Sequence, residues 1–145
     1  MIRIICLGKL KETYLINLVD DYKKRIEKYH KIEIVELKDE NDLAKEKEGI
    51  LKNIKKDDYV VLLDLKGKQM TSEEFAKEID KSFMNAGIID FVIGSSDGVD
   101  DEVKKRANQT ICFSNMTFPH GLFRGILLEQ IYRAFKINNN ETYHK

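Results

Sequence analysis

The feature that most constrains the fold is a pair of short apolar runs in the last third of the chain, each ending in a loop of small and polar residues. Phe91–Gly94 leads into Ser-Ser-Asp-Gly, and Thr110–Phe113 leads into the loop Ser114–Gly121, which holds the only proline. The apolar stretch Leu122–Lys136 follows and predicts a long helix. Strand ends that open into such loops leave backbone N–H and C=O groups free, and α/β proteins bind ligands there. We therefore predict the binding site at these strand ends.

Upstream, the same alternation of strand and helix patterns continues. Apolar, β-branched runs predict strands at Ile2–Leu7, Ile32–Leu37 and Tyr59–Asp64. The second run alternates apolar with acidic residues, which is typical of an edge strand with one solvent-facing side. The third is continuously apolar, which predicts a strand buried on both faces, and a turn at Lys66–Lys68 is expected to end it.

Helices are predicted between the strands. Apolar residues at helical spacing occur among charges after the first strand and in Lys38–Lys56. Thr71 and Glu74 have the spacing of a capping box that opens a helix to about Asn85. Acidic residues at 100–102 favour another helix N-terminus, with a helix to about residue 108. This order predicts the α/β class, with a mainly parallel sheet covered by helices on both faces.

Length and composition limit the kinds of protein that this chain can be. The length of 145 residues and a hydrophobic content of 42% predict one domain, residues 1–145, with a single core. Because 25 basic side chains balance 25 acidic ones, no overall field draws the chain to nucleic acid or anionic lipid. Cys6 and Cys112 lie far apart in apolar runs and lack metal-ligand spacing. No segment has the length of a signal peptide or membrane span, so we expect a cytoplasmic protein.

The stretch Leu122–Lys136 also carries information about assembly. Its apolar residues cover more than one stripe of a helical wheel, and a helix that is apolar on two faces is buried twice. A second copy of the chain is the simplest second cover, so we predict a homodimer with twofold symmetry. Burial of both faces within one chain is the alternative.

Nucleotide-binding motifs are absent, but one hydrolase motif occurs. There is no Walker sequence and no Gly-x-Gly-x-x-Gly after the first strand. Residues 94–98 do spell Gly-x-Ser-x-Gly, which makes Ser96 a candidate serine nucleophile. However, Asp100 and Asp101 follow directly, where neither can orient a histidine toward Ser96. The serine hydrolase reading is therefore disfavoured.

Several motifs, in order, resemble one known family. They are Leu63-Asp-Leu-Lys-Gly-Lys68, Phe91-Val-Ile-Gly94, Phe113-Ser-Asn-Met-Thr-Phe-Pro-His120, Glu129-Gln-Ile-Tyr-Arg-Ala-Phe-Lys136 and Tyr143-His-Lys145. From the first strand to the last residue, the chain is similar to the bacterial ribosomal RNA large subunit methyltransferase H family, of the SPOUT class. The resemblance implies a deep trefoil knot near the C-terminus and a homodimer. It also implies methylation of N3 of a pseudouridine in 23S rRNA, on the assembled ribosome, with S-adenosyl-L-methionine as methyl donor and without a metal.

The resemblance also assigns site residues. Cofactor contacts fall on three strand ends, at Leu63, Gly94, Phe113, Ser114, Asn115, Met116, Thr117 and Phe118. The catalytic candidates are His144, Tyr143 and Arg133, with His120 and Arg124 nearer the cofactor loop. Removal of the N3 proton requires a base, and an imidazole has a suitable pKa class.

Three further expectations follow from the family pattern. The family usually has a second glycine where this chain has Ser95, so Ser95 is strained if that position needs a positive φ. We expect the tail that carries Tyr143 and His144 to close the open side of a cofactor pocket, with a substrate surface that combines one subunit's pocket with residues of its partner. A neutral chain suits recognition of an assembled particle by shape better than binding of naked RNA. A ribosome-associated factor of the same fold that no longer transfers methyl groups is the alternative function.

Overall fold

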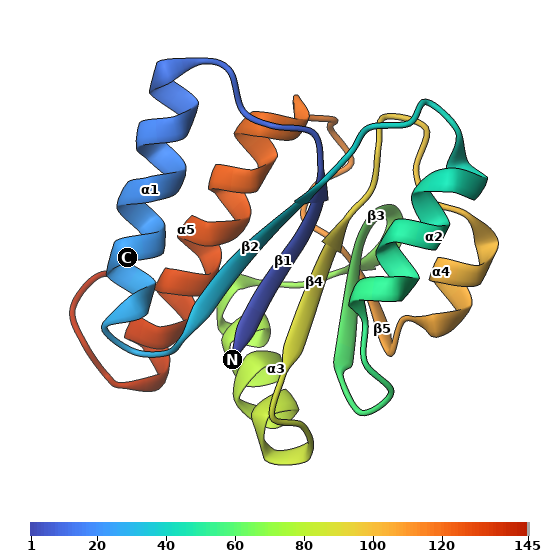
Figure 1. The fold of residues 1–145 in the computed structure, drawn as a ribbon. Coiled ribbons are helices and arrows are strands. Elements are labelled where there is room, and N and C mark those ends of the chain that lie inside the picture. The colour runs from blue at the N-terminus through green and yellow to red at the C-terminus, as the bar shows by residue number, and fades with distance from the viewer. Residues whose placement is uncertain (145) are drawn as a thin grey trace.

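A parallel sheet with helices on both faces forms the structure, a computed structural model in which residues 1–144 are described (Figure 1). This confirms the predicted α/β class. The elements, in chain order, are β1 (Ile2–Leu7), α1 (Thr13–Glu27), β2 (Ile32–Leu37), α2 (Leu43–Asn53), β3 (Tyr59–Gln69), α3 (Ser72–Asn85), β4 (Ile89–Ile93), α4 (Asp101–Arg106), β5 (Gln109–Cys112) and α5 (His120–Asn138).

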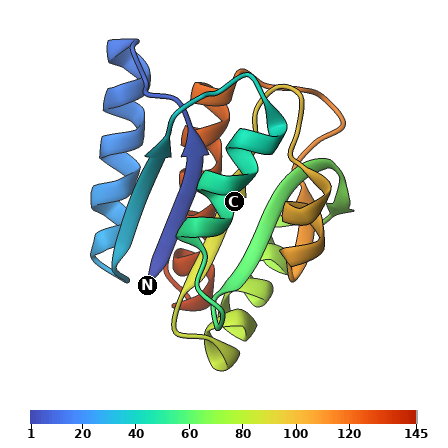
Figure 2. The same cartoon turned by 45° about the vertical axis from the view of Figure 1, so that its right-hand side comes forward.

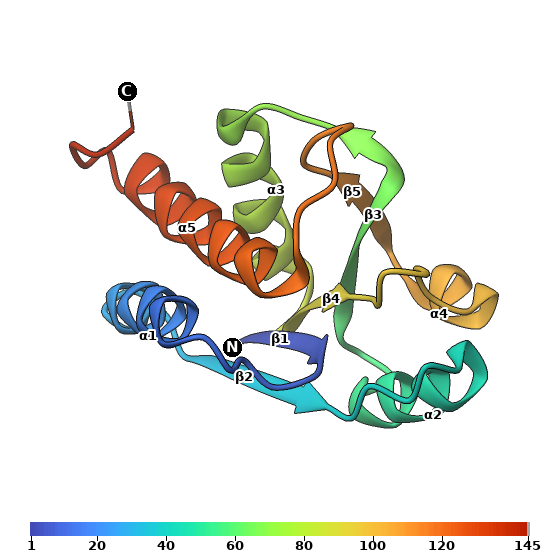
Figure 3. The ribbon, with the colours of Figure 1, turned by 90° about the horizontal axis from the view of Figure 1, so that it is seen from above.

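The sheet divides the core into two layers. Its strand order is β2-β1-β4-β3-β5, and the neighbouring strands pair in parallel. Helices α1, α3 and α5 pack on one face, and α2 and α4 cover the other (Figure 3). Figure 2 shows α2 in front of the sheet and α5 behind it. Because all the strands run the same way, their carboxyl ends gather at one edge.

Burial follows the sequence pattern in most strands. Every residue of β4 is buried, as a central strand covered on both faces requires. Strand β2 lies at the sheet edge, and its acidic residues Glu33 and Glu36 are less buried than Ile32. The predicted edge strand is therefore confirmed.

Strand β3 is longer than predicted. Leu63 pairs with Ile111 of β5, and after an irregularity Lys68 pairs with the same residue. The expected turn at Lys66–Lys68 is therefore wrong, because this polar segment bends back over β5. A Cβ on Gly67 would lie 2.6 Å from the carbonyl carbon of Ile111, so glycine is required where the two backbones meet.

Local capping sets the helix starts. Thr71 Oγ1 accepts the backbone N–H of Glu74 at 3.1 Å, and Glu74 accepts that of Thr71 at 2.9 Å, which confirms the capping box. Asp42 caps α2, so that helix is shorter than the predicted 38–56. Over residues 1–144, no helix combines the length and the apolar character needed to cross a membrane.

Helix α5 has both of its apolar sides covered within the chain. It packs between α1 and α3, and Leu127, Leu128 and Ile131 are fully buried. Gly121 and Gly125 allow the close approach to α1, since an added Cβ at Gly125 would lie 2.4 Å from Leu18. Because α1 and α3 cover much of α5, the apolar pattern of this helix does not by itself require a second copy of the chain.

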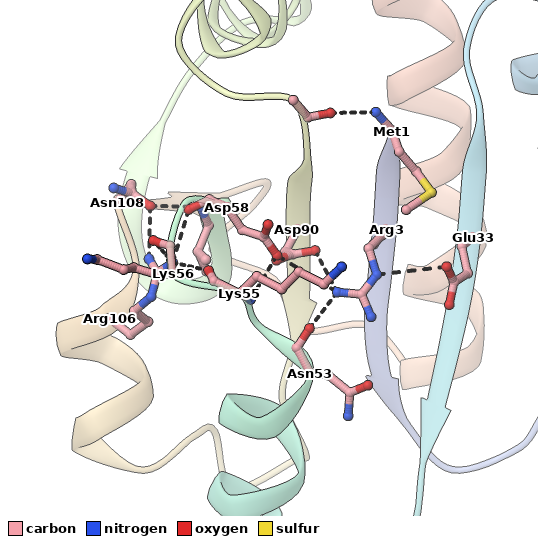
Figure 4. Close-up of polar contacts among 12 residues, drawn as sticks. Met1, Arg3, Glu33, Asn53, Lys55, Lys56, Asp58, Asp90, Arg106 and Asn108 are labelled. Atoms are coloured by element: carbon pink, nitrogen blue, oxygen red, sulfur yellow. Dashed lines mark hydrogen bonds and ion pairs between the residues drawn. The ribbon is translucent and has the colours of Figure 1, made fainter.

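A buried polar cluster lies at the amino ends of the strands (Figure 4). The guanidinium of Arg3 donates to the carbonyl of Asn53 at 2.5 Å and to Asp90 Oδ1 at 3.2 Å. Asp58 Oδ2 lies 3.9 Å from the same nitrogen, and Glu33 is a more exposed neighbour. Burial, followed by the effect of Asp58, raises the pKa of Asp90 to about 7. Two buried carboxyl groups thus share one guanidinium.

Candidate functional site

A cavity of about 610 Å³ opens at the carboxyl ends of β3, β4 and β5. Its volume lies in the range of small-molecule sites. Its lining is mainly apolar and comes from the three strand ends, the turn after β4 and the first turn of α5. The lining residues are Leu63, Asp64, Leu65, Ile93, Gly94, Ser95, Ser96, Gly98, Val99, Ile111, Cys112, Phe113, Ser114, Met116, Thr117, Phe118, Pro119, His120 and Phe123.

Gly94 brings bare backbone to this cavity. A Cβ at Gly94 would lie 2.5 Å from Val99 Cγ1 and 2.6 Å from the carbonyl oxygen of Gly98. The turn that follows is closed by Gly98 N–H donating to Ser95 O at 2.9 Å. Gly98 has a φ of +87°, whereas Ser95 does not have a positive φ. The strain considered for Ser95 is therefore not present, and its hydroxyl contacts the Gly98 carbonyl at 3.3 Å instead.

The loop after β5 forms another wall. Ser114 Oγ accepts the N–H of Met116 at 3.0 Å, which bends the loop around the cavity. The ring of Phe113 packs edge-on against Phe123 of α5, with ring centroids 5.3 Å apart. Asn115 is turned away, because its Oδ1 accepts a hydrogen bond from Gln69 at 2.7 Å. Figure 3 shows the loop between β5 and α5 beside the end of β3.

Of the residues that the family resemblance assigns to the cofactor, only Asn115 is not part of the cavity lining. The other seven (Leu63, Gly94, Phe113, Ser114, Met116, Thr117 and Phe118) all line it. The pattern of strand ends did not identify Asp64, Val99 or Phe123, which line the same cavity. Their places in the sequence were the available signal, since Asp64 directly follows Leu63, Val99 follows the turn 94–98, and Phe123 lies in the first turn of α5.

Apolar side chains surround the mouth of the cavity. Leu65, Met116, Phe118 and Leu122 are 53%, 75%, 37% and 36% exposed. Three of them line the cavity, and Leu122 follows the lining residue His120 in α5. Large apolar side chains grouped in this way mark an interaction surface more often than side chains scattered singly.

The three catalytic candidates lie together on α5 and the tail. Arg133 Nη1 is 3.0 Å from His144 Nδ1, and the Arg133 guanidinium lies 5.0 Å from the centroid of the Tyr143 ring. Tyr143 packs edge-on against Tyr132, and its hydroxyl is 3.4 Å from that of Tyr22. Burial, followed by the contact with Tyr22, raises the pKa of Tyr143 to about 12. A phenol in this state is a poor base near neutral pH.

Two carboxylates hold this group in place. Glu129 accepts from Arg133 Nη2 at 2.6 Å and from Nε at 2.9 Å, which raises the pKa of Arg133. Glu73, on α3, lies 2.5 Å from His144 Nε2, and this hydrogen bond lowers the pKa of Glu73. Arg133 can only donate, so His144 Nδ1 accepts and its proton is on Nε2, facing Glu73.

This group is distant from the cavity of its own chain. Phe123, at the cavity, and Arg133 are ten residues apart on α5, which corresponds to roughly 15 Å along a helix. Figure 3 shows α5 ending on the side away from the β5–α5 connection. Neither Tyr143 nor His144 lines the cavity. The tail therefore does not close the pocket of its own chain.

His120 and Arg124 have different environments. His120 lines the cavity at the start of α5. Arg124 is buried, donates to Glu36 at 2.7 Å, and reaches the carbonyl oxygens of Leu7 and Gly8 at 3.3 and 3.2 Å. Arg124 thus joins α5 to the ends of β1 and β2.

Ser96 lacks the partners of a hydrolytic serine. It is exposed on the turn after β4. Among residues 1–144, no hydrogen bond joins Ser96 to a histidine or a carboxylate. A nucleophilic serine needs such a base within hydrogen-bond reach. The geometry gives no support to the hydrolase alternative.

A second cavity, of about 510 Å³, lies near the opposite edge of the sheet. Its walls include Tyr29, His30, Phe83 and Phe135, from α3, α5 and the loop after α1. The His30 ring stacks on Phe83 with centroids 4.3 Å apart, and burial lowers the pKa of His30. This cavity contains none of the predicted site residues.

Comparison with known proteins gives concordant results. The family model described as predicted SPOUT methyltransferase matches residues 1–144. A protein of Clostridium acetobutylicum named ribosomal RNA large subunit methyltransferase H is 52% identical over 157 residues, which cover 99% of each chain. A protein of the same name from Caldicellulosiruptor saccharolyticus is 47% identical over the whole of both chains.

The fold is also found among solved structures. A probable methylase family protein from Haemophilus influenzae aligns with 99% of this chain and 70% of its own, with a TM-score of 0.57. Sequence identity is 15%, so this likeness concerns the fold alone.

Proposed function

This chain belongs to the SPOUT methyltransferase family, and we propose that it methylates N3 of a pseudouridine in the RNA of the large ribosomal subunit. Methyltransferases of this family use S-adenosylmethionine as methyl donor. The specific base is suggested by the near full-length similarity to proteins named ribosomal RNA large subunit methyltransferase H. A ribosomal substrate would place the enzyme in the cytoplasm.

One observation carries the assignment of the cofactor site. The cavity at the ends of β3, β4 and β5 gathers seven of the residues that the family pattern connects with the cofactor. The residues present fit such a ligand. The contact of Gly94 with Gly98 and Val99 leaves no space for a side chain on that wall, so backbone groups face the ligand. Apolar walls from Phe113 and Phe118 suit the adenine ring.

When bound, S-adenosylmethionine supplies a methyl group on a positively charged sulfur. The protein must hold the N3 atom of the base in line with the methyl–sulfur bond and exclude water. The N3 proton must also be removed, because the imide nitrogen is protonated near neutral pH. His144 is the proposed base. The lone pair of its Nδ1 atom accepts a hydrogen bond from Arg133 Nη1, and the two nitrogens are 3.0 Å apart.

We propose that the base comes from a partner subunit. Arg133 lies too far along α5, and His144 in the tail beyond it, to serve the cavity of their own chain. The exposed apolar residues Leu65, Met116, Phe118 and Leu122 offer a surface that a second copy would cover. A homodimer that sets the tail of one subunit over the cavity of the other would complete both sites.

The family pattern further includes a trefoil knot, which we propose for this chain. Support comes from the bend of β3 around β5, where Lys68 and Leu63 pair with the same residue, Ile111. We also propose the assembled ribosome as substrate, because equal numbers of acidic and basic residues favour recognition of a shaped particle over naked RNA.

Transfer of tritiated methyl groups to ribosomes that lack the modification tests the proposed activity. Incorporation that depends on the enzyme supports a methyltransferase. Cofactor binding without incorporation would instead support the alternative, a non-catalytic ribosome-associated factor of the same fold.

A further inference from the structure

Asp64 is the only carboxylate among the residues that line the cavity. It follows Leu63 at the end of the regular part of β3 and is half-buried. Alternation along the strand puts Asp64 on the same side as Leu62, which packs in the core layer with Val99. The turn 94–98, which forms part of the cavity wall, lies on this same side.

The Asp64 carboxylate has no internal partner. Within residues 1–144, no hydrogen bond or ion pair engages it, although a charge at the wall of an apolar cavity normally finds one. Of the other lining side chains, His120 can carry only a positive charge, and the Cys112 thiol donates to the carbonyl oxygen of Ser114 at 3.0 Å. A cationic ligand would therefore meet a negative wall at Asp64.

We propose that Asp64 makes the cavity prefer the positively charged methyl donor over its uncharged product. This inference rests on the proposed function. S-adenosylmethionine has a sulfonium, an ammonium and a carboxylate, for a net charge of +1. On transfer, the bond from sulfur to methyl breaks, the bond from N3 to methyl forms, and the N3 proton passes to the base. The sulfur becomes a neutral thioether, so S-adenosylhomocysteine has a net charge of zero.

The charge difference resides only at the sulfur. A carboxylate in the wall of a partly dry cavity attracts a cation several ångströms away, even when the two do not touch. The attraction is present for the donor and lost for the product. An effective dielectric constant of about 20 and a separation of about 7 Å correspond to a preference on the order of tenfold or more. Asp64 would thus help the donor to outcompete the product for the cavity between turnovers.

Other contacts of Asp64 would have different consequences. A hydrogen bond to a ribose hydroxyl or to the ammonium group would stabilise donor and product alike, because both molecules contain these groups. The ratio of the two affinities separates these contacts from an interaction with the sulfonium. The rate gives a second distinction. Since the sulfur loses its charge on the way to the transition state, Asp64 stabilises the bound donor more than the transition state.

Calorimetric titration of the dimeric enzyme with donor and with product tests the proposal. In Asp64→Asn, which keeps the shape and removes the charge, we expect the Kd for S-adenosylmethionine to rise about tenfold. The Kd for S-adenosylhomocysteine should change by less than about twofold. In methylation assays, KM for the donor should rise while kcat stays the same or increases. Asp64→Glu, which keeps the charge, should retain most of the preference.

Asp97→Asn is the matched control. Asp97 is an exposed carboxylate on the turn after β4 that does not line the cavity, so its removal should leave both affinities unchanged. Equal weakening of donor and product by Asp64→Asn, or no weakening, would overturn the role of Asp64 while leaving the proposed function intact. A wild-type protein that binds neither ligand would overturn both.

Discussion

Arg133 Nη1 donates a hydrogen bond to His144 Nδ1 across 3.0 Å, and Glu73 lies 2.5 Å from the other ring nitrogen. An arginine cannot accept in return, so Nδ1 of His144 accepts this hydrogen bond and Nε2 faces Glu73. The lone pair that a base needs is therefore present but engaged by Arg133. For His144 to take a proton at Nδ1, the substrate must displace this contact.

Replacing His144 by alanine should separate catalysis from cofactor binding. General bases contribute about 100-fold or more to a rate, so we expect methyl transfer to fall by that amount. Cofactor affinity should change little, because the seven predicted cofactor residues that line the cavity are unchanged. Tyr143→Phe, which loses only the 3.4 Å contact with Tyr22, is the control and should retain most of the activity. Wild-type turnover in His144→Ala would exclude His144 as the base.

Gly94→Val should abolish cofactor binding. Even the first carbon of the new side chain would lie 2.6 Å from the carbonyl oxygen of Gly98, so the wall of the cavity must shift. Calorimetry should show no binding of S-adenosylmethionine, together with a lower melting temperature. Asp97→Asn, on the exposed part of the same turn and outside the cavity lining, should bind and transfer normally. Unchanged affinity in a folded Gly94→Val protein would refute the site assignment.

Substitution at the cavity mouth tests the proposed dimer. Leu122 is 36% exposed and borders the proposed contact surface, so Leu122→Asp should give a folded monomer with little activity. Met84 is 81% exposed at the far end of α3, and Met84→Asp should leave the dimer intact. Light scattering at assay concentration provides the molar mass. An active monomer of the wild type would contradict the proposal that two chains build each site.

Ile131 illustrates why the dimer is better tested at the cavity mouth than at a buried position of α5. Its side chain is fully buried between helices of the same chain. Burying an unpaired carboxylate costs several kcal/mol, so Ile131→Asp should unfold the protein. Circular dichroism would show the loss of helix. A folded but monomeric Ile131→Asp protein would mean that α5 is not covered as described.

Much of the fold follows from local pattern, and the exceptions have tertiary causes. The run from Phe91 and the capping box of Thr71 and Glu74 are local signals, and both predictions are confirmed. The polar end of β3 has no strand pattern, because only its pairing with Ile111 makes it a strand. A helix that is apolar all round does not reveal whether its cover is its own chain or another, as α5 demonstrates.

In the candidate site, too, some features follow from local sequence pattern and others depend on tertiary contacts. Strand ends that lead into polar loops identified the region of Gly94 and Phe113, which line one cavity. The orientation of Asn115 depends on Gln69, 46 residues away, and no local pattern encodes it. The position of His144 depends on contacts with α3, so its distance from the cavity was equally inaccessible to sequence reasoning.

Asp90→Asn should change the pH dependence of stability. The pKa of Asp90 is raised from its ordinary 3.8 to about 7, chiefly by burial and then by Asp58. Between these values the folded chain holds a proton that the unfolded chain has lost, so stability falls as pH rises from about 4 to 7. Asp90 alone changes the free energy of unfolding by at most about 1.4 kcal/mol per pH unit. An asparagine keeps the acceptor for Arg3 and removes this slope.

Denaturant unfolding at several pH values measures the effect. The variant should gain stability relative to the wild type as pH rises through this window and hold a constant advantage above it. Glu33→Gln, at the exposed side of the same cluster, should reproduce the wild-type slope. A difference between Asp90→Asn and wild type that does not vary with pH would contradict a protonated Asp90.

Mass spectrometry of ribosomal RNA after reaction tests the central claim most directly. Purified ribosomes that lack the modification are incubated with enzyme and S-adenosylmethionine, and the RNA is digested to nucleosides. We predict one new methyl group per large-subunit RNA, on N3 of a pseudouridine, and far less on protein-free RNA. Absence of methylated pseudouridine at saturating cofactor, with cofactor binding intact, would contradict the account.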